Sequence, residues 1–210
     1  MKIPVEFAAF EKLYLAGEAQ VIWTRLVADL ETPVSAMLKL ADGRPNSFLL
    51  ESVEGGALRG RYSILGMRPD LIWRCRGNKA EINRQARSDP HAFAPCPVAE
   101  REGALASLRA VVAESRIDIP QGLPPMAAGL VGYMGYDVVR LVEKLPDDNP
   151  DPIGIPDGMF LRPTVMAIFD NVDDGVTIVT PVRPQPGVNA RAAYGQACER
   201  LSDVVADFES

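Results

Sequence analysis

The sequence has little of what metal sites and acid–base catalysts commonly use. Its 210 residues include a single histidine, His91, whose neighbours Pro90 and Ala92 offer it no partner. A Ser-His-Asp triad or a histidine-based metal site would depend on that one residue. We therefore expect His91 to be a solvated loop residue, and we find no catalytic group and no metal-ligand set in the sequence.

Cysteine is also scarce. Cys75, Cys96 and Cys198 lie far apart, no CxxC pair occurs, and their number is odd. This usage favours reduced thiols in a cytoplasm over a disulfide framework. The N-terminus has no uninterrupted apolar stretch of the kind that a signal peptide contains. The expected localisation is therefore cytoplasmic.

Long apolar runs and basic blocks are missing as well. No apolar run approaches the roughly 20 residues that a membrane-spanning helix needs. The net charge is −6, and the 22 lysines and arginines are dispersed along the chain. An acidic chain without a basic block binds nucleic acids and anionic membrane surfaces poorly. We expect neither nucleic acid nor membrane among its partners.

Two segments resemble ligand-binding motifs without matching them. Gly129, Gly132 and Gly135 follow an apolar run, but GLVGYMGYD fits neither GxGxxG nor GxxxxGK[ST]. The segment DNVDDG, residues 170–175, looks like part of a calcium-binding loop. Val172 occupies a ligand position, however, and Pro181 stands where the bidentate glutamate is needed. A hairpin turn is the better interpretation of this segment.

Apolar residues near the N-terminus have the spacing of a helix. Val21, Ile22, Leu26 and Leu30 recur at intervals that suit one face of a helix. The pair Thr32-Pro33 is expected to end that helix, because proline disfavours a helical residue before it.

Short apolar runs dominate the rest of the chain. Leu71, Trp73 and Cys75 alternate on one face of a strand. Together the patterns predict an α+β fold with mostly antiparallel sheets, two of them packed together, covered by helices. Helices are expected near residues 18–30, 102–115 and 192–208, with a short one over 138–142. Strands are expected over 34–40, 48–52, 61–65, 71–75, 80–83, 127–133, 164–169 and 176–180, and loops over 84–101 and 145–163.

Four blocks in a fixed order point to a family. They read LLESVEGG, GRYSILGMRPDLIW, GLVGYMGYDVVRLVEKLP and RPTVMAIFDN. The chain, from about Phe7 to Phe208, resembles the N-terminal half of anthranilate synthase component I, a chorismate-utilising enzyme. The resemblance implies that residues 1–210 form a regulatory and scaffolding domain. It also implies that chorismate and Mg²⁺ bind in a later segment, so that no cofactor is expected here, and that a glutamine amidotransferase is a partner.

The resemblance also gives the polar end of one strand a role. In the family, the Leu-Leu-Glu-Ser segment forms part of an allosteric site for L-tryptophan, and the matching residues are Leu50, Glu51 and Ser52. The carboxylate of Glu51 suits the effector's α-ammonium group. An arginine, Arg59 or Arg61, suits its α-carboxylate. Pro33, in the pair Thr32-Pro33, is implied as a further contact.

The residues by themselves leave other interpretations open. Glu51 could instead form an ion pair with Arg59 or Arg61 across the hairpin. Within the same superfamily, the chain could be part of aminodeoxychorismate synthase component I. A stand-alone module that binds an amino acid is the third interpretation.

Overall fold

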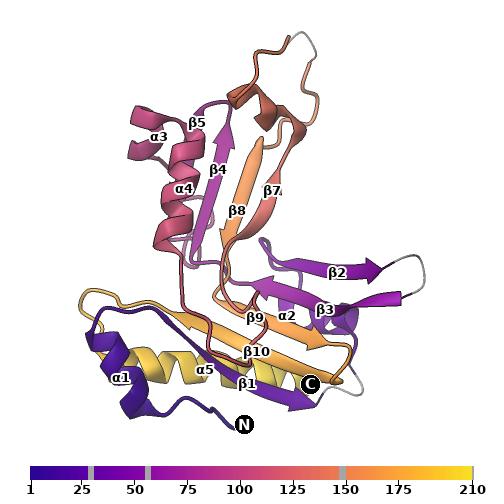
Figure 1. The fold of residues 1–210 in the computed structure, drawn as a ribbon, viewed down its shortest axis with the longest axis vertical. Coiled ribbons are helices and arrows are strands. Elements are labelled where there is room, and N and C mark those ends of the chain that lie inside the picture. The colour runs from indigo at the N-terminus through magenta and orange to yellow at the C-terminus, as the bar shows by residue number, and fades with distance from the viewer. Residues whose placement is uncertain (28–30, 55–57, 147–149, 210) are drawn as a thin grey trace. The chain divides into compact units, whose positions relative to one another are not determined.

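The computed structural model describes residues 1–27, 31–54, 58–146 and 150–209, and only the backbone at 53–54, 58–59 and 209. The chain forms two compact units. Unit 1 consists of Met1–Arg68, Ile117–Ala128 and Thr164–Ser210, and unit 2 of Pro69–Arg116 and Gly129–Pro163. The chain thus passes between the units four times, and each unit has its own sheet (Figure 1).

The sheet of unit 1, sheet A, has five strands in the order β1-β10-β9-β3-β2, and all neighbours are antiparallel. Its strands are β1 (Gln20–Val27), β2 (Phe48–Glu54), β3 (Leu58–Met67), β9 (Val165–Asp170) and β10 (Gly175–Val182). The helices of this unit are α1 (Phe7–Leu15), α2 (Pro33–Ala41) and α5 (Ala190–Glu209).

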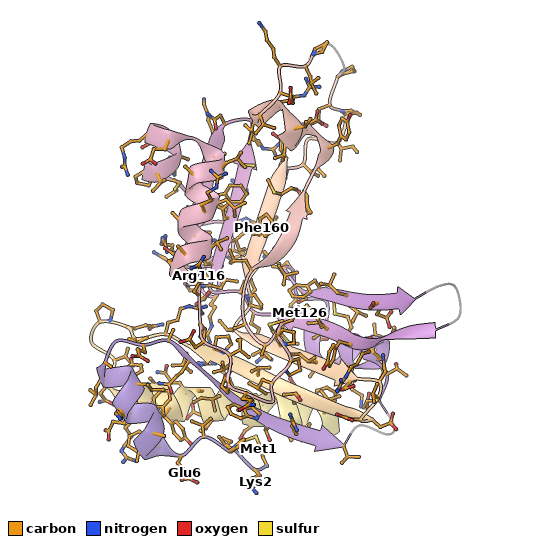
Figure 2. The ribbon with its side chains drawn as sticks, viewed as in Figure 1. Met1, Lys2, Glu6, Arg116, Met126 and Phe160 are labelled. Atoms are coloured by element: carbon orange, nitrogen blue, oxygen red, sulfur yellow. The ribbon has the colours of Figure 1, made fainter. Side chains whose placement is uncertain are left out.

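Sheet A buries both of its faces. Ile22 and Leu65 belong to the core that the three helices share with one face, whereas Val21 and Ile64 belong to the core of the other face. Consecutive residues separate in this way because side chains alternate across a strand. The segment 117–127 covers the second face with apolar side chains. The N-terminal segment is held to β1 by a 2.9 Å hydrogen bond from the Thr24 hydroxyl to the carbonyl of Lys2. Figure 2 labels Met1, Lys2 and Glu6 along this segment.

The predicted helix over 18–30 is wrong for the residues that the structure describes. Residues 20–27 form β1, which pairs with β10 from Gln20↔Val182 to Val27↔Gly175, and 28–30 lie outside the described residues. Because both faces of this strand are buried, its apolar residues do not alternate with polar ones. Such a run cannot be distinguished from a helix by periodicity alone.

The predicted strand over 34–40 is also wrong, because Thr32-Pro33 begins a helix. Thr32 is the N-cap of α2, and Pro33 takes the first helical position, where proline needs no hydrogen-bond partner. The Thr32 hydroxyl accepts from the Ser35 backbone N–H at 3.0 Å, and the Ser35 hydroxyl accepts from the Thr32 N–H at 2.9 Å. Ala36 and Leu40, one turn apart, are buried against sheet A.

The sheet of unit 2, sheet B, also has five antiparallel strands, in the order β6-β5-β4-β8-β7. Its core holds Leu71, Trp73 and Cys75, which confirms the predicted alternation. The Trp73 indole N–H donates to the Ser107 hydroxyl at 2.8 Å, so the buried polar atom of the largest core side chain has a partner. The elements of this unit are β4 (Leu71–Arg76), β5 (Lys79–Asn83), β6 (Ala94–Pro95), β7 (Val131–Met134), β8 (Gly158–Arg162), α3 (Pro97–Glu102), α4 (Ala104–Glu114) and the 3₁₀ helix η1 (Tyr136–Leu141).

The α+β prediction, with antiparallel sheets and covering helices, is confirmed. So are the helices near 102–115 and 192–208 and the hairpin at 170–175. The expected loops are shorter than predicted, because 84–101 contains β6 and most of α3, and 145–163 contains β8. The helix α1 was not predicted. Within the part of the chain that the structure describes, no helix is long and apolar enough to cross a membrane.

The capping of α2 leads to a stability prediction. Thr32→Ala removes the hydroxyl that accepts from the Ser35 N–H, and we expect it to lower the free energy of unfolding by about 1 kcal/mol. Urea denaturation of the protein measures this loss. Thr32→Ser keeps the oxygen and should stay close to the wild type; an equal loss in both variants would show that the cap does not stabilise the helix.

Candidate functional site

The predicted effector residues Leu50, Glu51 and Ser52 lie on β2, an edge strand of sheet A. All three are exposed, and Leu50, a large apolar residue, is 47% exposed. A strand at the edge of a sheet also leaves backbone donors and acceptors without strand partners. These residues therefore lie together on one exposed edge strand, although Leu50 and Glu51 point to opposite faces of it.

Strand pairing decides which face each of these side chains occupies. Leu49 lies opposite Leu65, and Glu51 lies opposite Ser63 in the same register. Leu49 and Leu65 belong to the core that also contains residues of α2. Since residues two apart on a strand share a face, Glu51 lies on the face that α2 covers, and α2 begins with the buried Pro33. The fold thus brings α2 and the Leu-Leu-Glu-Ser strand into one unit, although the predicted strand over 34–40 was wrong.

The register between β2 and β3 breaks at Ser52. Glu51 pairs with Ser63, but Val53 pairs with Arg59, so Ser52 alone faces Gly60, Arg61 and Tyr62. Such bulges interrupt the ladder, bend the strand and redirect side chains, and they are common beside functional sites. The sequence prediction placed a hairpin here and did not include the bulge.

Arg61 pairs with Asp170, whereas Glu51 was the partner considered from the sequence. Its guanidinium donates to Asp170, with the shortest contact at 2.8 Å, and lies 3.4 Å from Asp173. The hydrogen bond from Arg61 lowers the pKa of the Asp170 carboxyl below its ordinary value. Arg61 also lies over the Tyr62 ring, 5.0 Å from its centroid. The sequence indicated Asp170 and Asp173 only as turn residues, because nothing local shows that β3 and β9 are neighbours.

Glu51 has no ion pair with any described side chain. The side chain of Arg59, the other arginine considered for this role, lies outside the described residues. Arg61 therefore pairs with Asp170, and not with Glu51 across the hairpin. The contacts predicted between tryptophan and Leu50, Glu51, Ser52, Arg61 and Pro33 stay predictions.

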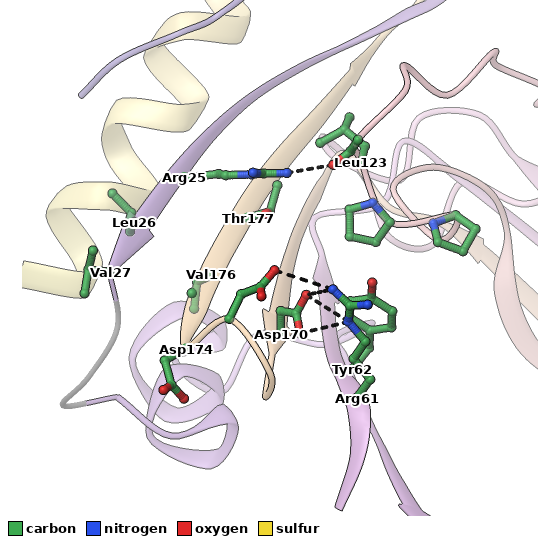
Figure 3. Close-up of a pocket in the computed structure, with 15 residues that line it drawn as sticks. Arg25, Leu26, Val27, Arg61, Tyr62, Leu123, Asp170, Asp174, Val176 and Thr177 are labelled. Carbon is green, nitrogen blue, oxygen red and sulfur yellow. Dashed lines mark hydrogen bonds and ion pairs between the residues drawn. The ribbon is translucent and has the colours of Figure 1, made fainter.

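A pocket of about 600 Å³ lies beside the Arg61–Asp170 pair (Figure 3). Arg25 closes one side by donating to the Gly122 carbonyl at 2.6 Å. The pocket includes Arg61 but none of Leu50, Glu51 and Ser52. It combines two arginines and three aspartates, of which Arg61 pairs with Asp170 and Asp173, with apolar walls. Its lining residues come from the end of β1, the β9–β10 turn, the bulge of β3 and the segment 122–125.

The other chemical features expected of the sequence are unremarkable in the structure. His91 is exposed in a loop, and its backbone N–H donates to Asp89 at 2.8 Å. Across the described ranges, no three His, Cys, Asp or Glu side chains come close enough to hold a metal ion. Cys75, Cys96 and Cys198 are free thiols. Burial raises the pKa of the Cys75 thiol, which keeps it protonated.

No family model matches the sequence. The chain is 54% identical over 204 residues to anthranilate synthase component 1 of Cereibacter sphaeroides, a match that covers 97% of this chain and 40% of that protein. It is 34% identical to the Synechocystis protein of the same name, with 97% and 39% covered. The chain therefore spans about 40% of the length of these relatives, as expected for the N-terminal part of component I.

A solved structure shares the fold. The crystal structure of anthranilate synthase component I from Streptococcus pneumoniae aligns with a TM-score of 0.51 and 20% identity, covering 88% of this chain and 36% of that one. This likeness concerns the fold alone, whereas the sequence identity extends along almost the whole chain. The identity of 54% along nearly the whole chain, together with the four ordered sequence blocks, shows that the chain belongs to the anthranilate synthase component 1 family.

Proposed function

We propose that this chain forms the N-terminal regulatory and scaffolding part of an anthranilate synthase and carries part of its L-tryptophan feedback site. The complete subunit would convert chorismate and ammonia to anthranilate and pyruvate, the first committed step of tryptophan biosynthesis. Identity of 54% to a protein named anthranilate synthase component 1 supports this assignment over aminodeoxychorismate synthase. It also favours it over a stand-alone amino-acid-binding module.

The observation that carries the feedback site is the exposed carboxylate of Glu51 on an edge strand, next to a bulge. Arg61 is committed to Asp170, so it does not neutralise Glu51. A carboxylate in this situation can bind the α-ammonium group of an amino acid. The Ser52 hydroxyl, the neighbouring residue, can add a hydrogen bond to the same ligand.

The chemistry of the remaining predicted contacts follows from their surroundings. Leu50 points to the opposite face of β2 from Glu51, so it would contact the indole ring only where the ligand extends past the strand edge. An effector carboxylate that binds Arg61 would compete with Asp170 for the guanidinium, so the proposal depends on Glu51 and Ser52 first. Pro33 stands at the start of a helix that contacts β2, which makes it a candidate second wall.

The partners follow from the same proposal. Chorismate and Mg²⁺ would bind to a segment outside these 210 residues, and a glutamine amidotransferase would supply the ammonia. The free thiols of Cys75, Cys96 and Cys198 fit a cytoplasmic location.

Removing the Ser52 hydroxyl tests the feedback site. In the full-length protein that carries this chain, Ser52→Ala should raise the tryptophan concentration needed for half-inhibition by roughly tenfold to a hundredfold. That is the range expected for one hydrogen bond to a charged ligand group. The rate with saturating chorismate should stay nearly unchanged.

Ser202→Ala, an exposed serine on α5, is the matched control and should leave inhibition intact. If Ser52→Ala keeps wild-type sensitivity, or loses activity and inhibition together, Ser52 is only a hairpin residue.

The second test concerns catalysis. The 210-residue chain, shown to be folded by circular dichroism, should produce no anthranilate from chorismate, ammonia and Mg²⁺. Its one histidine, His91, is exposed in a loop, and no three His, Cys, Asp or Glu side chains of the described residues come close enough to hold a metal ion. Anthranilate fluorescence measures the product, and the full-length protein is the positive control. Turnover above the uncatalysed background would show that the 210-residue chain is itself catalytic and would refute this prediction.

A further inference from the structure

The bulge beside Ser52 leaves backbone groups of β3 without ladder partners on β2. Gly60, Arg61 and Tyr62 face the single residue Ser52, so the regular exchange of hydrogen bonds stops there. Extra residues in a bulge are unpaired by the neighbouring strand, and their polar groups need other partners. Whatever supplies these partners also fixes the shape of the bulge.

Gly60 makes the close approach of Ser52 possible. A Cβ atom built on Gly60 would lie 2.3 Å from the Ser52 hydroxyl oxygen and 2.4 Å from its Cβ. Both distances are far below van der Waals contact, so the Ser52 side chain occupies the space that a larger residue at 60 would fill. The position of the Ser52 hydroxyl therefore depends directly on the backbone at Gly60.

The partners of the bulge come from Asn171, the residue that follows β9. Its backbone N–H donates to the Arg61 carbonyl at 2.8 Å, and its side-chain amide donates to the Gly60 carbonyl at 2.7 Å. One residue thus satisfies two consecutive carbonyls of the bulge. The opposite side of the same bulge contacts Ser52.

Asn171 is itself held in place by Asp170. The Asp170 carboxylate accepts from the Val172 N–H at 3.0 Å, which closes the turn around Asn171. The same carboxylate accepts from the Arg61 guanidinium, so the turn is attached to the bulge by a side-chain pair as well (Figure 3). The β9–β10 turn and the bulge therefore form one hydrogen-bonded unit.

We propose that Asn171 is a positioning residue for Ser52, acting through Gly60. The Asn171 amide fixes the Gly60 carbonyl, and the Gly60 backbone leaves room for the Ser52 side chain. The Ser52 hydroxyl is thereby held on β2, where we propose that tryptophan binds. This inference rests on the proposed feedback site for its effect on tryptophan. The effect on β2 itself is independent of any ligand.

The test uses Asn171→Ala in the full-length protein. This variant keeps the backbone N–H and removes only the amide that donates to Gly60. Val172→Ala is the control, because Val172 belongs to the same turn and is 67% exposed. Asn171→Asp is a second variant of nearly equal shape that also removes the donor, in case the alanine variant does not fold.

The first measurement needs no ligand. Hydrogen–deuterium exchange in peptides that cover residues 48–52 should be faster in Asn171→Ala than in the wild type, and unchanged in Val172→Ala. Unchanged exchange in both Asn171 variants would overturn the positioning role, whatever the protein binds.

The second measurement is calorimetric titration with L-tryptophan. Asn171→Ala should bind tryptophan about threefold to tenfold more weakly, the effect of one ordinary hydrogen bond, while the rate with saturating chorismate stays as in the wild type. In a Ser52→Ala background, Asn171→Ala should weaken binding little further, since coupled residues are not additive. Additive losses would show that Asn171 acts elsewhere, and wild-type affinity in Asn171→Ala would also refute the inference.

The two measurements separate this inference from the proposed function. If the wild-type protein does not bind tryptophan, the proposed feedback site is wrong. A change in exchange on β2 would still support Asn171 as the residue that positions Ser52.

Discussion

The pairing of β3 with β9 is the constraint on which the rest of the structure depends. Met67 lies opposite Val165, although the whole of unit 2 is inserted between them in the sequence. The Thr164 hydroxyl donates to the Arg68 carbonyl at 2.6 Å, which closes the base of the insertion. Closing so long a loop costs entropy, but the cost grows only slowly with length. The many buried residues of sheet A offset it.

This pairing also builds the surroundings of the candidate site. It places Asp170 opposite Tyr62, and therefore the β9–β10 turn beside the bulge of β3. Arg61 then meets Asp170 and Asp173, carboxylates that lie far away in sequence. The Arg61 side chain is half-exposed, and exposed ion pairs contribute little to stability. Its consequence is directional, because it fixes the Arg61 guanidinium on the β9–β10 turn.

The polar residues of β2 lie next to the register change between β2 and β3. A regular β2–β3 ladder would have paired Ser52 directly with Tyr62. The bulge places three residues opposite it, and one of them is a glycine whose missing side chain admits the serine. The hydroxyl and the carboxylate that follow Leu50 thus lie at an edge whose shape is set by three segments, β2, β3 and the β9–β10 turn.

Features that depend on short-range patterns could be predicted from the sequence. The alternation of Leu71, Trp73 and Cys75 predicted β4, the turn at 170–175 predicted the last hairpin, and the Leu-Leu-Glu-Ser block predicted the strand that carries Glu51 and Ser52. The order of the four blocks predicted the family. These patterns are local or collinear, so they can be interpreted without knowing which segments meet.

Features that depend on distant partners became visible in the folded protein. Residues 20–27 are a strand because β10, at the other end of the chain, pairs with them, and because the helices of unit 1 and the segment 117–127 cover the two faces of the sheet. Arg61 contacts Asp170, and Asn171 contacts Gly60, because β9 lies beside β3. Periodicity and propensity describe a segment's own preferences, whereas strand partners and ion pairs arise from the packing of segments that are remote in sequence.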